Sequence, residues 1–139
     1  MIVIKAEVKG EPDVPPFKRI FEYLDESDEE IFFDSVKTIR EKLSKKLRLN
    51  TNESLALYCW YVVDQLRAHK STNTIERNAP VIFSENVMIG VPETLRTISF
   101  EVILDNSPKK KITLHEPIPT SCRWRQELKD VHRDIDTGN

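Results

Sequence analysis

The stretch from Leu55 to Val63 is apolar on almost every side of a helix, and it constrains the fold more than any other part of the chain. Asn50 and Glu53 precede it with the three-residue spacing of a capping box, which predicts that a helix begins at about Asn50. A helix that is apolar all round is stable only if neighbours pack on several of its sides. We therefore expect this helix, which also carries Trp60, to be the centre of the core.

An amphipathic helix is predicted before it. Ser27 and Glu30 have the capping spacing, and the acidic residues between them suit the positive end of a helix dipole. Apolar residues then recur every three or four positions and form one stripe: Phe32, Val36, Ile39, Leu43 and Leu47. The basic run between Lys37 and Arg48 lacks aromatic residues for base stacking and is interrupted by an acidic residue. It therefore favours a solvated face, or a rim that meets an acidic partner, over a nucleic-acid site.

Alternating apolar residues predict three strands. Residues 2–8 place Ile2, Ile4, Ala6 and Val8 on one face, and residues 98–104 and 111–115 alternate around a turn at Asp105–Pro108. The last two strands predict a hairpin. The first strand either pairs with the edge of this hairpin or adds to the sheet of another chain. After the first strand, residues 17–24 are expected to form a short helical turn.

Three further helices are expected. Ser71 or Thr72 begins a short one through Ile75, and Ser84 caps another over residues 85–95. Within the latter, Gly90 suggests close packing and Pro92 a kink or an early end. A C-terminal helix capped by Ser121 has an apolar stripe that either folds back or docks on a partner: Trp124, Leu128, Val131 and Ile135.

Composition argues against several classes of function. The formal charge of −2, from 21 basic and 23 acidic residues, favours neither nucleic acid nor an anionic membrane as a partner. No apolar run approaches the roughly 18 residues that span a bilayer, and the N-terminus lacks a signal-peptide pattern, so we expect a cytoplasmic chain without membrane insertion.

The residues that could carry chemistry form no recognisable group. His69, His115 and His132 make no closely spaced pair, so no metal site is predicted. Cys59 lies in the apolar helix, where a buried thiol is inert, and Cys122 lies among arginines. A catalytic role for Cys122 is the less favoured interpretation, because arginines near a cysteine are common by chance. We therefore predict no catalytic residue and no cofactor in this chain.

Four segments, in order, resemble the gamma subunit of urease. Arg48–Leu57 is similar to that family's Arg-Leu-Asn-Tyr-Pro-Glu-Ala-Val-Ala-Leu, and Gln65–Lys70 stands where the family has an alanine-arginine-x-glycine-lysine helix end. Asn86–Leu95 resembles its Val-Met-x-Gly-Val-Pro-Glu-Met segment, and Leu114–Ile118 resembles its closing Val-His-Asn-Pro-Ile. The chain departs from the family at Thr51-Asn52, at His69 and in the longer turn at Asp105–Pro108.

The resemblance implies a fold and a role. We expect an α+β fold, with a bundle of three or four helices and an antiparallel hairpin over residues 28–118, an N-terminal strand and arm over 1–27, and an amphipathic helix over 119–139. The family's gamma subunit is non-catalytic and assembles with beta-type and alpha-type chains, and nickel is expected only on such a partner. The alternative is a scaffold or docking subunit of an unrelated multi-protein complex.

Both roles imply an oligomeric assembly of protein subunits. The candidate partner interface combines the two chain ends with the histidine of the closing motif: Ile2, Ile4, His115, Trp124, Leu128, Val131 and Ile135.

Overall fold

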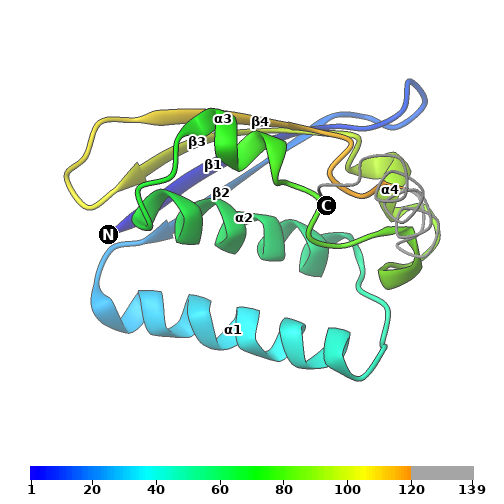
Figure 1. Ribbon diagram of the computed structural model, residues 1–139, viewed down its shortest axis with the longest axis horizontal. Coiled ribbons are helices and arrows are strands. Elements are labelled where there is room, and N and C mark those ends of the chain that lie inside the picture. Colours follow the sequence, from blue (N-terminus) through cyan, green and yellow to red (C-terminus); the bar gives the residue numbers. More distant parts are fainter. Residues whose placement is uncertain (120–139) are drawn as a thin grey trace, which may run out of the picture.

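The computed structural model describes residues 1–119 as a four-stranded antiparallel sheet with helices gathered on one side (Figure 1). The strands are β1 (Ile2–Lys9), β2 (Phe17–Tyr23), β3 (Thr97–Leu104) and β4 (Lys110–His115). The helices are α1 (Glu26–Ser44), α2 (Thr51–Arg67), α3 (Thr72–Arg77) and α4 (Val91–Thr94), with a single 3₁₀ turn, η1 (Ser84–Asn86), before α4. The expected α+β class is confirmed.

The sheet has the order β2-β1-β3-β4, so β1 lies between β2 and the β3–β4 hairpin. Ile4 pairs with Phe21 on one side and with Val102 on the other. Because side chains alternate along a strand, one face collects the fully buried aliphatic residues of β1 and β3. The predicted first strand and hairpin are confirmed. Of the two pairings left open for the first strand, it pairs within its own chain.

The helical turn expected at residues 17–24 is wrong, because these residues form β2. Phe17, Phe21 and Tyr23 share one face of the strand and pack against the core. The spacing of Phe17 and Phe21 fits both a helix and a strand, and pairing with β1 along seven residues decides between them. The first 27 residues thus supply half of the sheet and do not form a separate arm.

Helix α2 is the centre of the core, as predicted. Leu55, Tyr58, Cys59 and Val62 are at most 1% exposed, because the sheet and the other helices surround α2. The capping box is present: the Glu53 N–H donates to Asn50 Oδ1 at 2.8 Å, and the Asn50 N–H donates to Glu53 Oε1 at 3.0 Å. Trp60, which was expected in the core, is only partly buried, and the Arg40 guanidinium lies 4.8 Å from the centre of its ring.

The N-terminal cap of helix α1 lies two residues earlier than expected. Its cap is Asp25, whose Oδ1 accepts from the Asp28 N–H at 2.8 Å, so the expected Ser27–Glu30 box is wrong. Asp25 is extended, with φ of −129°, two residues after the end of β2, and it therefore takes the cap position first. The apolar stripe is buried through its first three members, whereas Leu47 follows the helix end and is 50% exposed.

The single helix expected over 85–95 is also wrong. Val87 is extended and forms a bridge with Leu49 between η1 and α4. Gly90 has φ of +93° at the start of α4, with open space where a Cβ would lie, so it serves the backbone turn and not close packing. Pro92 lies in the first turn of α4, where no N–H is needed. By contrast, Ser71 caps α3 as predicted.

Candidate assembly surface

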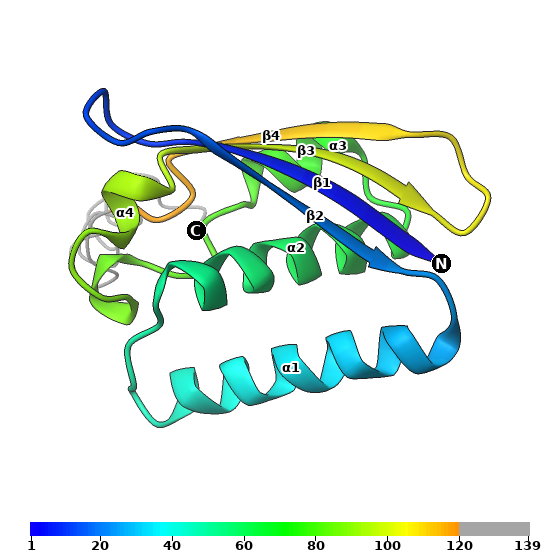
Figure 2. The same ribbon diagram turned by 180° about the vertical axis from the view of Figure 1, so that it is seen from behind.

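Three segments meet at one end of the domain: α4, the β1–β2 loop and the end of β4 (Figure 2). Arg96, between α4 and β3, pairs through Nη1 with Glu116 Oε1 at 3.1 Å and through Nη2 with Glu11 Oε1 at 2.5 Å. All three side chains are exposed, so these ion pairs fix geometry more than they add stability.

The backbone also joins the β1–β2 loop to α4. The Glu11 N–H donates to the Glu93 carbonyl at 3.0 Å. A Cβ on Gly10 would stand 2.8 Å from that carbonyl oxygen and 2.9 Å from the oxygen of Thr94. Only glycine permits this close approach, so the loop and α4 form one fixed surface.

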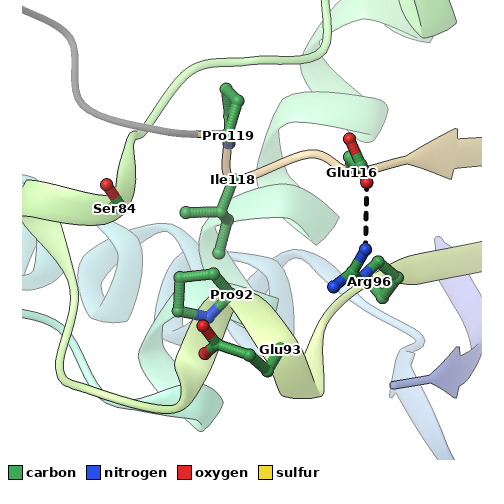
Figure 3. Close-up of a pocket in the computed structure, with 7 residues that line it drawn as sticks. All are labelled: Ser84, Pro92, Glu93, Arg96, Glu116, Ile118 and Pro119. Atoms are coloured by element: carbon green, nitrogen blue, oxygen red, sulfur yellow. Dashed lines mark hydrogen bonds and ion pairs between the residues drawn. The ribbon is translucent and has the colours of Figure 1, made fainter. Parts of the chain in front are cut away.

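A pocket of about 220 Å³ lies on this surface (Figure 3). Two of its charged groups, Arg96 and Glu116, are already paired with each other, while Ile118 and Pro92 add apolar lining. The full lining is Ser84, Pro92, Glu93, Arg96, Glu116, Ile118 and Pro119. The lining therefore offers shape and mixed polarity.

The segment after β4, residues 116–119, is held by hydrogen bonds to the rest of the domain. We call it the closing segment. The Tyr58 hydroxyl donates to the Pro117 carbonyl and accepts from the Val81 N–H at 3.4 Å. Burial raises the pKa of Tyr58, so the phenol stays protonated and can donate. The Ser84 N–H donates to the Pro119 carbonyl at 2.9 Å. The residues after β4 are therefore held in place as far as the last described residue.

Exposed apolar side chains lie on the loop before α4 and on the segment between α1 and α2. The Met88 N–H donates to the Leu49 carbonyl at 2.9 Å, which holds the loop against the start of α2. Ile89 follows and is 96% exposed, Met88 is 47% exposed, and Leu47 two residues before Leu49 is 50% exposed. We call Leu47, Met88 and Ile89 the apolar tip. A contiguous exposed apolar patch, unlike a single exposed residue, marks a surface that docks on another protein.

The residues predicted to meet a partner are placed differently from one another. Ile2 and Ile4 are fully buried in this chain's own core, so the structure does not support them as interface residues. His115 is exposed at the end of β4, opposite Thr97. Trp124, Leu128, Val131 and Ile135 lie outside the described residues.

The apolar tip and the Glu11–Arg96 pair were not predicted from the sequence. Ile89 directly before a glycine was a usable signal, because Gly90 takes a positive φ that ends regular structure. A single helix expected over residues 85–95 was incompatible with a turn at Gly90. The Glu11–Arg96 pair joins residues 85 positions apart, and no local pattern announces it.

Within residues 1–119, no three His, Cys, Asp or Glu side chains are grouped so that they could hold a metal ion. His69 lies two residues after the end of α2, and His115 lies at the end of β4. Cys59 is fully buried, and burial raises the pKa of its thiol, so it is protonated and unreactive. In the same part of the chain, no helix combines the length and apolarity needed to cross a membrane.

Comparison with known proteins identifies relatives of this domain. The family model described as urease, gamma subunit, matches residues 24–118. The chain is 31% identical to the urease subunit gamma of Halalkalibacterium halodurans over 94 residues, which cover 67% of this chain and 93% of the relative. It is 36% identical to the urease subunit gamma of Methylocella silvestris over 80 residues, which cover 57% of this chain and 79% of the relative.

Proposed function

Because the chain belongs to the urease gamma-subunit family, we propose that it is a non-catalytic, gamma-type structural subunit of a urease-like assembly. Its partners would be a beta-type chain and an alpha-type chain, and the alpha-type chain would carry the nickel and the reaction. The proposed subunit is cytoplasmic and contributes binding surface and geometry to the complex.

The observation that carries this proposal is that exposed apolar residues lie within the segment that matches the gamma-subunit family. The match spans 93% of a gamma subunit, and the matched residues include Met88 and Ile89 of the apolar tip, which are exposed on the surface of the domain. An isoleucine that is 96% exposed on a hydrogen-bonded loop adds nothing to this chain's core. Its apolar area is available to a partner, and burying it there would stabilise the complex.

Co-expression with alpha-type and beta-type chains tests the proposal. The tagged chain is expected to retain both chains on affinity purification, with urea hydrolysis in the purified complex. Ile89→Asp is expected to weaken retention by at least about tenfold, because a buried carboxylate replaces an apolar contact. Ile31→Asp is the matched control, since Ile31 is 65% exposed on α1, away from the apolar tip.

Two results would count against the proposal. If neither chain is retained by the wild-type protein, the alternative of a scaffold in an unrelated complex is favoured. If both aspartate variants retain the partners equally well, the apolar tip is not the contact surface.

A further inference from the structure

Strand β2 is the free edge of the sheet on the side of α1 (Figure 2). All of β2 lies before residue 24, where the match to the gamma-subunit family begins, so the role proposed above does not account for it. An edge strand presents unpaired backbone N–H and C=O groups that can bind another strand. The sequence of β2 decides which strand this edge is suited to bind.

The exposed side chains of β2 leave this edge accessible. Ile20 is 65% exposed on the face of the sheet that the helices do not cover. On the opposite face Arg19 is exposed, whereas Phe17 and Phe21 on either side of it are half-buried. The helices thus cover only part of β2, and an apolar residue stands at its midpoint.

One more exposed apolar residue lies at the end of the same edge. Leu24 directly follows β2 and is 60% exposed. Apolar surface therefore continues one residue beyond the strand itself.

We propose that β2 pairs antiparallel with β2 of a second copy of this chain, about a twofold axis through Ile20. The sequence Phe17-Lys-Arg-Ile-Phe-Glu-Tyr23 is complementary to itself in this register. Lys18 stands opposite Glu22 of the second copy, and Ile20 opposite its own symmetry mate. Arg19 stands opposite Phe21 of the second copy, and Phe17 opposite Tyr23. The result is a continuous eight-stranded sheet.

The chemistry of these pairs favours association. Directly opposed residues of opposite charge stabilise antiparallel strands, and each copy supplies one lysine and one glutamate to two such pairs. Within one copy, the Arg19 guanidinium already lies 5.2 Å from the centre of the Phe17 ring, so this arginine packs against aromatic faces. The interface is isologous, as most dimer interfaces are.

Charges on an edge strand usually prevent pairing, so the register is decisive. Moving the axis to Phe21 would place Lys18 opposite Leu24 and Glu22 opposite Ile20, which loses both charge pairs. Moving it to Arg19 would place the two Arg19 side chains opposite each other. Only the register centred on Ile20 pairs the charges of Lys18 and Glu22, and this selects one alignment of the two copies.

Charge reversal of the full chain, without any other subunit, tests the proposal. Sedimentation equilibrium is expected to show a reversible monomer–dimer equilibrium for the wild type. Lys18→Glu places glutamate opposite glutamate in two pairs across the dimer, and Glu22→Lys places lysine opposite lysine in two pairs. Each variant is therefore expected to raise the dimer Kd by at least about tenfold. An equimolar mixture of the two variants restores both charge pairs and is expected to dimerise about as strongly as the wild type. The double variant K18E/E22K is expected to do the same.

Controls separate association from folding. Lys37→Glu is a matched charge reversal on an exposed position of α1 and is expected to leave the Kd unchanged. Lys18 makes one exposed ion pair in its own chain, with Glu7 at 3.5 Å, so its reversal is expected to shift the melting temperature little. If K18E does not fold, Ile20→Asp takes its place as the weakening variant.

A monomeric wild type at all concentrations would overturn the proposal, as would a dimer that resists every β2 variant or a mixture of K18E and E22K that fails to associate. None of these results bears on the gamma-type role. That role is tested by retention of other chains and depends on residues outside β2.

Discussion

Removing the hydroxyl of Tyr58 tests how the closing segment is held. The ring is fully buried, and its hydroxyl contacts both the Pro117 carbonyl and the Val81 N–H. Tyr58→Phe preserves the ring and leaves both backbone groups without this partner. An unsatisfied buried polar group costs about 1–3 kcal/mol, so we expect a loss of about 2 kcal/mol in unfolding free energy.

The melting temperature reports this loss. For a chain of this size, about 2 kcal/mol corresponds to a decrease of about 8 °C, which differential scanning calorimetry resolves easily. Tyr23→Phe is the matched control, because Tyr23 is half-buried at the end of β2, and its melting temperature is expected to stay within about 2 °C of the wild type. If Tyr58→Phe also melts within that range, the hydroxyl does not hold the closing segment and this reasoning fails.

Other predictions concern the cap, the core, the loop and the tail. Burial acts to raise the pKa of Glu53, but hydrogen bonds from the Asn50 N–H and Lys42 outweigh it and hold the pKa below its usual value. Glu53→Gln is therefore expected to cost about 1 kcal/mol at neutral pH. By linkage, the difference in unfolding free energy between the wild type and Glu53→Gln is fully present above the unfolded pKa near 4.5. It disappears as the pH falls through the lowered folded pKa, which urea titrations at several pH values measure. Leu57→Ala is expected to cost about 2–5 kcal/mol in urea unfolding, and a loss below about 0.5 kcal/mol would mean that α2 is not the core. Gly10→Ala is expected to cost about 1–3 kcal/mol, because a Cβ would press on two carbonyl oxygens of α4, and an unchanged melting temperature would contradict that contact. Removal of residues 120–139 is expected to reduce retention of partner chains and to change the melting temperature by less than about 2 °C. A lower melting temperature with unchanged retention would show that the predicted apolar stripe of residues 124–135 serves this chain's own stability.

The sequence was most predictive where local and tertiary requirements agree. In α2 the Asn50–Glu53 box and the apolar run indicate the same helix, and both are present. In the β3–β4 hairpin, alternation and turn residues coincide in the same way. These signals act over a few residues, so one sequence is enough to find them.

It failed where a distant segment decides the structure. The residues of β2 have an ambiguous spacing, and only pairing with β1 makes them a strand. The segment around Val87 is extended because Leu49 bridges it, and the positive φ of Gly90 then starts α4 anew. The same tertiary contacts hold Ile89 in water, which is why the apolar tip was not anticipated.

Native mass spectrometry of the complex purified through this chain tests the central claim most directly. If the chain is a gamma-type subunit, co-expression with alpha-type and beta-type chains yields one assembly that contains all three. Nickel then accompanies the alpha-type chain, and this chain carries none when it is released from the complex. An assembly of the alpha-type and beta-type chains that excludes this protein, or stoichiometric nickel on this protein alone, would contradict the account.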